Sequence, residues 1–558
     1  MASPRKAGIT RSAGGAAEAR AKPGPGAARP GSSRDAAAIG SGLAAATGRE
    51  IELKLKLRTR DIPLLRARLD RLGKSRQQHV DNVYYDTPDL RLAQARAALR
   101  LRSVGGGGRR RWVQTFKTED METPLAVRGE WESPAPGGRL DVARLSHSPL
   151  AQLLGGLSGH GPEDGLAPVF RTVFDRSCWD LRFVAARIEA AIDLGEIQAH
   201  GHVETIREIE LELRAGEPAA LFDLALHLCH GRAGGGGADA ALSLVPYGAS
   251  KAARGYRLAR NQDPVEPVPG LPRRGSAAPG RASFAPDQPA PLAARQWLLQ
   301  TLEALLANVH GAGVSDDPEF VHQARIALRL MRVGADLLSA PADLPQSLPE
   351  AMQEWAKPLG EVREWDVICS QVLPGLRRRL GKGASTPWKK LRDAANARQA
   401  AARVDLRRRL EAPAFAEFAL RLMRWGATTP REPGQGLAEF AHRALRRRRR
   451  RLAKGVESFS QVSMARQHKI RLQAKNLRYA EQMLHAVLPG SLAGPRLRAL
   501  VRFQDAAGRA RDLALARTVL RSLTRAKPLR RELDDWLEEE RRKGEAAATR
   551  LSARLQRH

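Results

Sequence analysis

The chain has 558 residues and a formal net charge of +33, which comes from 93 Lys and Arg against 60 Asp and Glu. A length of this order corresponds to about two to four domains. The excess of positive charge points to a polyanionic partner, such as nucleic acid, an anionic membrane or polyphosphate, because neutralising many phosphates at once releases many counterions. Only 5% of the residues are aromatic, which disfavours a single-strand binder that stacks successive bases.

The cysteines and the apolar runs exclude further classes. Cys178, Cys229 and Cys369 stand singly with no C-x-x-C pair, which argues against a disulfide framework and against a cysteine zinc site. No apolar run approaches the roughly 18 residues that cross a bilayer, and the N-terminus lacks the apolar core of a secretory signal. We therefore expect a soluble, cytoplasmic protein with no membrane partner.

Two stretches of biased composition divide the chain. Residues 1–47 consist largely of Ala, Gly, Pro, Ser and Arg, and such a segment cannot bury enough apolar surface to offset the entropy of ordering, so we expect a disordered basic tail. Residues 261–290 are rich in Pro and are expected to form an interdomain linker. The predicted domains are therefore residues 48–260 and residues 291–558.

The first predicted domain contains apolar residues that alternate with polar ones. This period of two, which is typical of strands, occurs at residues 50–57, 98–102, 111–117 and 206–213. Residues 62–73 and 218–231 have helical spacing instead, and the glycine runs 105–108 and 234–237 are expected to be loops. The pattern predicts an α+β domain dominated by antiparallel strands.

The second predicted domain has only helical spacing, which predicts an all-α bundle. It holds 51 Lys and Arg against 28 Asp and Glu, a surplus of 23 positive charges. An internal repeat runs through it, because His, Arg, Arg or Lys, and Arg recur at offsets 0, 3, 7 and 10 from His322 and from His468. A Gly-x-x-Arg-acid motif follows each histidine, at Gly360 and at Gly508. The repeat predicts two similar helical units, at about 291–425 and 436–558.

Polar rows on several strands suggest a charged interior. Glu50, Glu52 and Lys54 fall on one face of a strand, and on one strand alone this would be an ordinary solvated face. The alternation recurs at Arg100, Arg102, Glu208, Glu210 and Glu212. If these rows line a barrel, each buried charge needs an opposite one, which a polyphosphate with a divalent metal supplies. Carboxylates suit Mg²⁺ or Mn²⁺, and the cations would cover phosphate oxygens, as metal-assisted phosphoryl transfer to water requires.

The motif Glu50-Ile-Glu52-Leu-Lys54 resembles the E-x-E-x-K signature of the CYTH domain, the triphosphate tunnel metalloenzyme superfamily, and the resemblance covers residues 49–260. Further matching motifs follow in order: YYDTP, ALRLR, QTFK, FDRSCW, AAIDLG, REIELEL and SKAARGYRL. The resemblance implies an eight-stranded antiparallel tunnel that binds a triphosphate with Mg²⁺ or Mn²⁺ and hydrolyses it.

The resemblance also implies roles for individual residues. The metal-binding acids would be Glu50, Glu52, Glu208, Glu210 and Asp193. The substrate-binding residues would be Arg100, Arg102, Lys117, Arg176, Lys251 and Glu130. Lys54 would orient the attacking water. For Glu212 and Lys56 an outer rim or a solvated strand end is an equally good interpretation.

The second domain resembles the CHAD domain, at VHQARIALRLMR (residues 321–332) and HKIRLQAKNLRYA (residues 468–480). That family is all-helical and duplicated, and the resemblance implies binding of inorganic polyphosphate through a basic surface or groove. The implied binding residues are His322, Arg325, Arg329, Arg332, His468, Arg471, Lys475 and Arg478. Their offsets place each set on one helical face. The six arginines at 446–451 cannot all share a face, and no specific function is expected of this run.

Taken together, the sequence predicts a cytoplasmic enzyme that hydrolyses inorganic triphosphate to diphosphate and phosphate and is associated with polyphosphate granules through its helical domain. Nucleic acid is not expected as a partner. Two alternatives stay open. The tunnel could act on another triphosphate, as a thiamine triphosphatase or an adenylate cyclase, or the protein could bind polyphosphate without catalysis.

Overall fold

The structure, a computed structural model, describes most of the chain from residue 49 onward. The described residues are 49–105, 111–120, 126–154, 165–230, 240–262, 265–270, 284–381, 385–428, 434–485, 487–488 and 494–556. The predicted tail at 1–47, most of both glycine runs and much of the predicted linker lie outside these ranges. No described helix combines the length and the apolarity that a membrane crossing requires.

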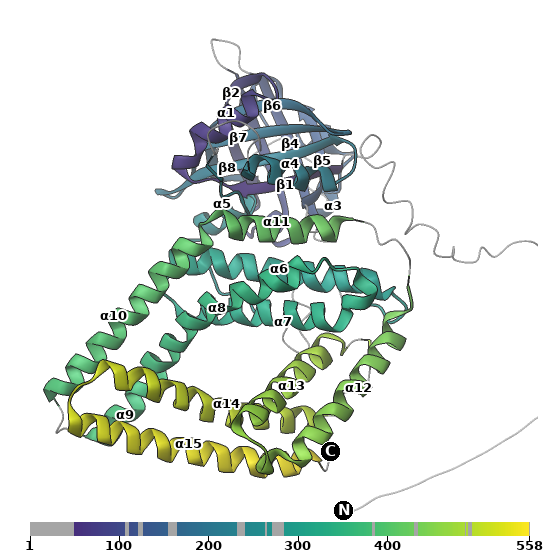
Figure 1. The fold of residues 1–558 in the computed structure, drawn as a ribbon. Coiled ribbons are helices and arrows are strands. Elements are labelled where there is room, and N and C mark those ends of the chain that lie inside the picture. Colours follow the sequence, from purple (N-terminus) through teal and green to yellow (C-terminus); the bar gives the residue numbers. More distant parts are fainter. Residues whose placement is uncertain are drawn as a thin grey trace, which may run out of the picture. The chain divides into compact units, whose positions relative to one another are not determined.

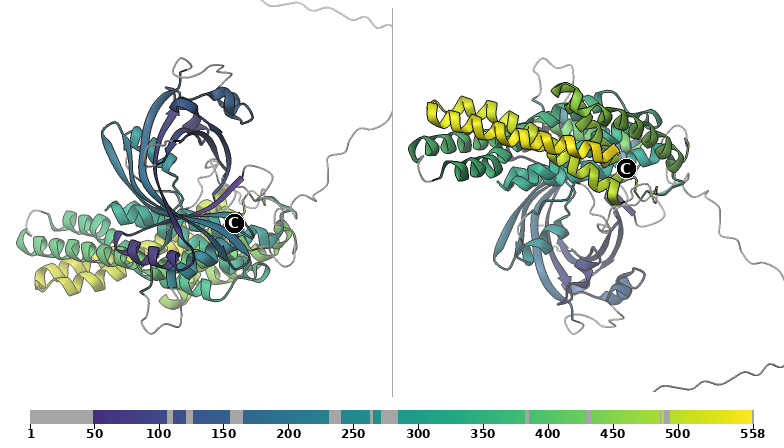
Figure 2. Two further views of the ribbon diagram at one scale, coloured as in Figure 1. Left: turned by 90° about the horizontal axis from the view of Figure 1, so that it is seen from above. Right: turned by 90° about the horizontal axis from the view of Figure 1, so that it is seen from below.

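Eight antiparallel strands close into a ring in the N-terminal part. Their order is β5-β4-β3-β2-β6-β7-β8-β1, and a further pairing of β5 with β1 closes the ring, whose curvature is visible in Figure 2. The strands are β1 (Arg49–Lys56), β2 (Ser75–Asp86), β3 (Ala97–Val104), β4 (Arg111–Asp120), β5 (Ala126–Pro134), β6 (Ala167–Phe183), β7 (Ala186–Ala199) and β8 (His202–Ala215). The two-residue strand β9 (Val245–Pro246) adds to β1, so the described sheet has nine strands in all.

The period-two pattern sorts side chains between the two faces of this ring. On β1, Leu53 and Leu55 are buried in an outer apolar layer that also holds Leu65 and Phe222, from helices α1 (Ile62–Asp70) and α4 (Ala219–His230). The polar residues between them line the interior. The strands and helices predicted from periodicity in this part of the chain are confirmed.

The ring is completed by short helices. The smaller helices α2 (Arg91–Gln94) and α3 (Leu150–Leu153) contribute to a second outer apolar cluster. Helix α5 (Lys251–Ala259) packs against β6, β7 and β8, where Tyr256 joins Tyr84, Phe170 and Phe174 in an apolar cluster. The Ser250 hydroxyl accepts a hydrogen bond from the Ala253 amide and so caps this helix. Helix α5 thereby carries two buried cations, Lys251 and Arg254, to the interior.

The C-terminal part is all-helical, as predicted (Figure 1). Its helices are α6 (Ala290–Val314), α7 (Pro318–Ala342), α8 (Ser347–Val367), α9 (Leu373–Leu380), α10 (Ser385–Leu410), α11 (Pro413–Ala427), α12 (Leu437–Glu457), α13 (Met464–Met483), α14 (Gly494–Leu523) and α15 (Lys527–Gln556). The order repeats: the histidine helices α7 and α13 each follow a first helix, α6 or α12, and each precede the helix with the Gly-x-x-Arg-acid motif, α8 or α14.

One described piece of the Pro-rich segment is held by tertiary hydrogen bonds. The backbone N–H and C=O of Val268 both bond to the Asn308 side chain, at 3.1 and 2.8 Å. The Gly270 amide donates to Gln323 at 2.8 Å. Residues 265–270 are therefore anchored to α6 and α7, which a linker assignment based on composition alone does not anticipate.

Candidate functional site

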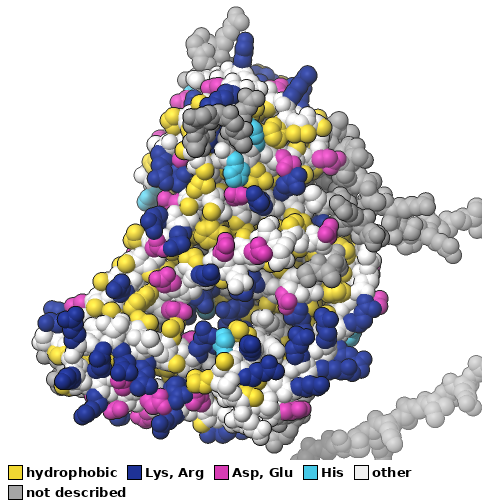
Figure 3. Space-filling model, in the orientation of Figure 1, with side chains coloured by type: hydrophobic (Ala, Val, Ile, Leu, Met, Phe, Trp, Pro, Cys, Tyr) yellow, Lys and Arg dark blue, Asp and Glu magenta, His cyan; other side chains and the backbone are white. Residues whose placement is uncertain are grey.

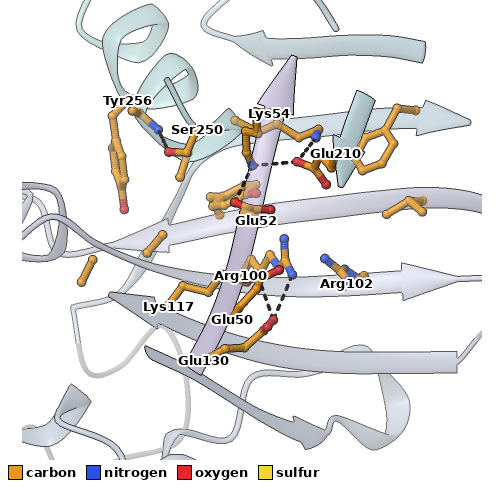
Figure 4. Close-up of a pocket in the computed structure, with 18 of the residues that line it drawn as sticks. Glu50, Glu52, Lys54, Arg100, Arg102, Lys117, Glu130, Glu210, Ser250 and Tyr256 are labelled. Carbon is orange, nitrogen blue, oxygen red and sulfur yellow. Dashed lines mark hydrogen bonds and ion pairs between the residues drawn. The ribbon is translucent and has the colours of Figure 1, made fainter. Parts of the chain in front are cut away.

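The interior polar residues of the strand ring meet in one cavity of about 570 Å³. It is lined by charged side chains from seven strands and by the N-terminal turn of α5 (Figure 4). Ten of the predicted site residues line it: Glu50, Glu52, Lys54, Arg100, Arg102, Lys117, Glu130, Arg176, Glu210 and Lys251. Asp193 and Glu208 reach the same group of charges through ion pairs with Lys251.

Three carboxylates form a compact group. Oxygen atoms of Asp193, Glu208 and Glu210 all lie within 4.8 Å of one another. The sheet register explains this, because Asp193 on β7 faces Glu208 on β8, and Glu210 follows two positions along the same face. Asp193 and Glu208 are almost fully buried. An all-oxygen set of this kind suits a hard divalent cation such as Mg²⁺ or Mn²⁺.

Cations surround this carboxylate group. Arg176 makes a bidentate pair with Asp193, at 2.7 and 2.6 Å, and also reaches Glu210 at 2.5 Å. Lys251 Nζ contacts all three carboxylates, including Asp193 at 2.6 Å and Glu210 at 3.0 Å. Lys54 Nζ lies 2.7 Å from Glu210 and 2.9 Å from Glu52. The buried charges thus neutralise one another, as a low-dielectric interior requires.

The pKa values reflect this arrangement. Burial alone would raise the pKa of Glu210, but Lys251, Lys54 and Arg176 hold it well below its ordinary value. Burial would lower the pKa of Lys251, whereas Asp193, Glu208 and Glu210 raise it above its ordinary value. Glu210 and Lys251 therefore stay charged near neutral pH, which is the state that binding both metal and phosphate requires.

A second charged group lies around Glu50. Lys117 Nζ is 2.6 Å from Glu50 Oε2 and 3.0 Å from Glu130 Oε1, and Arg100 Nη2 is 3.7 Å from Glu130. Arg100 is 9% exposed, yet within the described part of the chain its Nε and Nη2 atoms make no hydrogen bond. Buried guanidinium nitrogens of this kind are costly unless an acceptor is supplied, so the two Arg100 nitrogens have donor capacity left for an anion in the cavity.

Several interior residues were not predicted from the sequence. Arg254, on α5, pairs with Glu208 at 2.9 Å and with Glu204 at 2.6 Å. Tyr84 is buried beside Arg100, whose positive charge lowers the pKa of the Tyr84 hydroxyl, and it stacks on Phe170 with ring centroids 4.3 Å apart. Arg254 lies three residues after Lys251, on the same face of the helix, and this spacing was the signal that could have identified it.

Two residues, Glu212 and Lys56, were predicted to lie at an outer rim or at a solvated strand end. Glu212 lines the cavity, where burial and the neighbouring Glu50 raise its pKa to about 8. Glu212 therefore belongs to the interior rather than to a solvated strand end. Lys56 is exposed and does not line the cavity, which matches the rim interpretation. Arg102 also lines it, and burial together with Arg100 and Arg176 lowers the pKa of Arg102 to about 10.

In the helical part, the repeated motifs converge on a group of cations that we call the α7–α13 cluster. Its members are the eight predicted residues His322, Arg325, Arg329, Arg332, His468, Arg471, Lys475 and Arg478. Arg511 of the second Gly-x-x-Arg-acid motif lies 2.7 Å from the Nδ1 atom of His468, and Arg363 of the first motif lies near His322. A β-carbon at Gly360 would lie 3.0 Å from the Arg325 guanidinium, so glycine leaves room for this side chain.

The cations of the α7–α13 cluster repel one another, and their pKa values show it. Burial, Arg329, Arg471, Arg478 and Arg325 all lower the pKa of Lys475, to about 7. Burial and Arg329 likewise lower the pKa of Arg325 to about 10, although Glu364 opposes this. Within the described residues, Arg471 Nη1 and Arg478 Nε are buried without a hydrogen-bond acceptor. A set of unsatisfied, mutually repelling cations is an attractive site for a polyanion.

Fold and site define a two-part protein: a closed antiparallel barrel with a charged interior, followed by a duplicated helical domain with a cationic cluster. Comparison with known families agrees. Residues 48–233 match the CYTH domain, and residues 296–521 match the CHAD domain. The chain therefore carries a CYTH domain followed by a CHAD domain.

Individual relatives were found for each part. An inorganic triphosphatase of Haemophilus influenzae is 33% identical over 184 residues, which are 32% of this chain and 46% of that protein. The chain thus spans about half the length of this curated relative. The CHAD domain of the plant Ricinus communis is 23% identical, with a TM-score of 0.41, over 49% of this chain and 90% of that one. A Hippeastrum protein described as a putative adenylyl cyclase with a dominant triphosphatase activity is 21% identical, with a TM-score of 0.23, over 32% of this chain and 84% of that one.

Proposed function

We propose that the CYTH domain hydrolyses inorganic triphosphate to diphosphate and phosphate with Mg²⁺ or Mn²⁺. The observation that carries this proposal is the meeting, in one cavity, of the three close carboxylates and of Arg100 with its unbonded nitrogens. A protein that only binds polyanions would gain nothing from these carboxylates, because a carboxylate repels phosphate unless a metal cation lies between the two. The similarity to an inorganic triphosphatase supports the same activity.

Each residue has a role that follows from its position. Asp193, Glu208 and Glu210 would hold the metal ion, with Glu50 and Glu52 as further acids in the same cavity. When bound, the metal neutralises the charge of the phosphates and polarises a P–O bond. The cations around the cavity would hold the phosphate oxygens: Arg100, Arg102, Lys117, Arg176 and Lys251.

The reaction itself needs an oriented water. Its oxygen attacks the terminal phosphorus, the bond from that phosphorus to the bridging oxygen breaks, and diphosphate leaves with the electron pair. The Lys54 ammonium, held between Glu52 and Glu210, would fix the water oxygen by donating a hydrogen bond. The Glu52 carboxylate, which is not one of the three close carboxylates, would accept the proton of the water.

A phosphate-release assay tests this function. Tripolyphosphate, ATP and thiamine triphosphate would be compared with Mg²⁺ and with Mn²⁺, because the competing tunnel activities differ in the leaving group. We expect tripolyphosphate to be the preferred substrate and Glu210→Gln to lower turnover at least about 100-fold. The matched control is Glu217→Gln, an exposed acid. Preference for thiamine triphosphate, or cyclic AMP formed from ATP, would assign another tunnel activity, and no turnover with any substrate would contradict the enzymatic proposal.

We further propose that the CHAD domain binds inorganic polyphosphate at the α7–α13 cluster and thereby brings the protein to polyphosphate in the cytoplasm, including its granules. The buried, unbonded nitrogens of Arg471 and Arg478 support this proposal. Replacing Arg325, Arg329, Arg471 and Arg478 by Gln should abolish retention on immobilised polyphosphate. Removing four exposed cations elsewhere, at Arg378, Lys389, Lys390 and Arg398, should not. Unchanged retention of the cluster variant would refute the assignment.

A further inference from the structure

The arginine run at residues 446–451 is divided by the structure into two groups. Arg448 and Arg449 turn toward neighbouring helices: Arg448 pairs with Asp336 of α7 at 2.8 Å, and Arg449 pairs with Glu481 of α13 at 2.7 Å. Glu481 is fully buried. These two arginines therefore fasten α12 to the histidine helices.

The other four arginines face solvent. Arg446, Arg447, Arg450 and Arg451 are exposed, and in the described part of the chain no carboxylate lies within ion-pair distance of them. On a helix they share a sector with two more exposed cations, Arg443 and Lys454. This sector is roughly 140° wide and about 16 Å long. We call these six residues the α12 stripe, and on the face drawn in Figure 3 Lys and Arg side chains gather over this helix.

The duplicated fold does not require such a stripe. In the first repeat, the helix before the histidine helix is α6, and its one Lys or Arg is Arg295. Arg295 is 8% exposed and donates a hydrogen bond to the Thr428 carbonyl. The packing that α6 and α12 share is therefore achieved without cations on the outer face. A row of like charges destabilises a helix by self-repulsion, and a bound polyanion would compensate it. Arg443 is already paired within α12, with Glu439 at 3.2 Å.

The helix that carries the stripe lies next to the α7–α13 cluster. Asp336, the partner of Arg448, lies one turn after Arg332, the last cation of the first row. Glu481, the partner of Arg449, lies three residues after Arg478, the last cation of the second row. Helix α12 therefore packs against the end of the cluster, and in Figure 1 it runs beside α13. Arg448 and Arg449 occupy the face of α12 that is turned to the cluster, and the stripe occupies the opposite face. A chain that leaves the cluster at this end therefore reaches the stripe by passing around α12.

We propose that the α12 stripe is an extension site for linear polyphosphate, which engages those phosphates of a long chain that the α7–α13 cluster cannot hold. This inference rests on the proposed binding of polyphosphate by the cluster. A flexible phosphate chain can pass from one helix face to another, whereas a nucleic-acid duplex resists bending over such short distances. The stripe has no large apolar side chain, which disfavours insertion into a membrane.

The test is affinity as a function of chain length. Polyphosphates from short to long would be titrated against the full chain and against a variant with Arg446→Gln, Arg447→Gln, Arg450→Gln and Arg451→Gln. We expect the wild type to bind long chains at least about tenfold more tightly than short ones, through the second set of contacts. The variant should lose this gain and keep its affinity for short chains. Its salt slope for long chains should fall by roughly 3 if all four contacts are made.

The controls separate this inference from the proposed function. The matched control removes the same number of exposed charges at Arg378, Lys389, Lys390 and Arg398, and it should keep the length dependence. Wild type that binds no polyphosphate would overturn both proposals. Binding that is lost in the cluster variant but is equally length-dependent in the α12 variant would overturn only the extension site. An equal loss of length dependence in the matched control would also overturn it. So would a parallel titration with duplex DNA in which the α12 variant loses affinity for DNA alone.

Discussion

At the residue scale, the surroundings of Lys475 predict that polyphosphate binding depends on pH. Burial and four arginines lower its pKa to about 7, so at pH 8 the unliganded side chain is mostly neutral. A bound polyanion favours the ammonium form, and its binding should therefore take up roughly one proton per site. Affinity should weaken as the pH rises above about 7. Calorimetry at pH 8 in buffers of different ionisation enthalpy measures this uptake.

A lysine on the same helix provides the control. Lys475→Gln should abolish the proton uptake, whereas Lys469→Gln should retain it, because Lys469 is exposed. Equal uptake by the wild type and by Lys475→Gln would show that another group titrates.

The position of Tyr84 leads to a second prediction at this scale, on substrate binding. Its hydroxyl lies beside Arg100, and its ring stacks on Phe170. Tyr84→Phe keeps the stack and removes the hydroxyl next to Arg100, so we expect Arg100 to be held less firmly. The KM for tripolyphosphate should rise about threefold to tenfold, with a much smaller change in kcat. A loss of kcat at unchanged KM would contradict a role in positioning Arg100.

The sequence predicted the residues on strands better than those on helix α5. Alternation assigns Glu50, Glu52 and Lys54 to one face, and the structure places all three at the cavity. It cannot place Tyr84 beside Arg100, and the spacing that puts Arg254 on the same helix face as Lys251 does not show which acids Arg254 meets. These contacts follow from the closure of the ring and from the packing of α5, neither of which is visible in local spacing.

At the scale of elements, helix α5 depends on a glycine. A β-carbon at Gly255 would lie 2.1 Å from the Phe170 ring, so Gly255→Ala should push the helix outward and shift Lys251 and Arg254. We expect a loss of about 1–3 kcal/mol in the free energy of unfolding and reduced phosphate release. Thermal unfolding and the release assay measure the two effects.

Gly248→Ala serves as the control. A β-carbon there would have no neighbour within 4 Å, and its φ angle is not in the left-handed region. This variant should unfold and react like the wild type. If Gly255→Ala were equally neutral, α5 would not be fixed by its contact with Phe170.

Periodicity predicted most elements, and the reason is physical. A strand with one face toward an apolar layer must alternate, and a helix on a bundle must repeat about every 3.6 residues. Pairing between distant strands leaves no such trace. The contact of β5 with β1 joins segments some 75 positions apart in the sequence, and before the structure only the resemblance to a known family implied a closed tunnel. The short strand β9 has too few residues to show any period.

At the scale of the whole molecule, polyphosphate should stabilise the protein. A ligand that binds the folded state alone adds about 2.7 kcal/mol when its free concentration is roughly 100 times its Kd. We therefore expect long polyphosphate to raise the Tm of the transition that reports on the helical domain. The variant that lacks the four cluster arginines should show little shift. An equal shift in both proteins would indicate diffuse charge screening instead.

The charge composition of the second half of the chain predicted the kind of partner but not its binding site. A surplus of 23 positive charges from residue 291 onward predicts a polyanionic partner but not where it binds. The structure distributes that surplus among buried cluster cations, arginines paired with carboxylates, and an exposed helix face. Charge counts cannot separate these three groups, because burial and pairing are properties of the fold.

The duplication of the histidine helices has one more consequence. A linear polyphosphate reads the same from either end, and two equivalent rows of cations offer nearly the same contacts to both orientations. Because all inner phosphates of the chain are alike, advancing it by one phosphate would exchange each contact for an equivalent one. Such a binding site would let the chain slide along its cations rather than hold it in one fixed register.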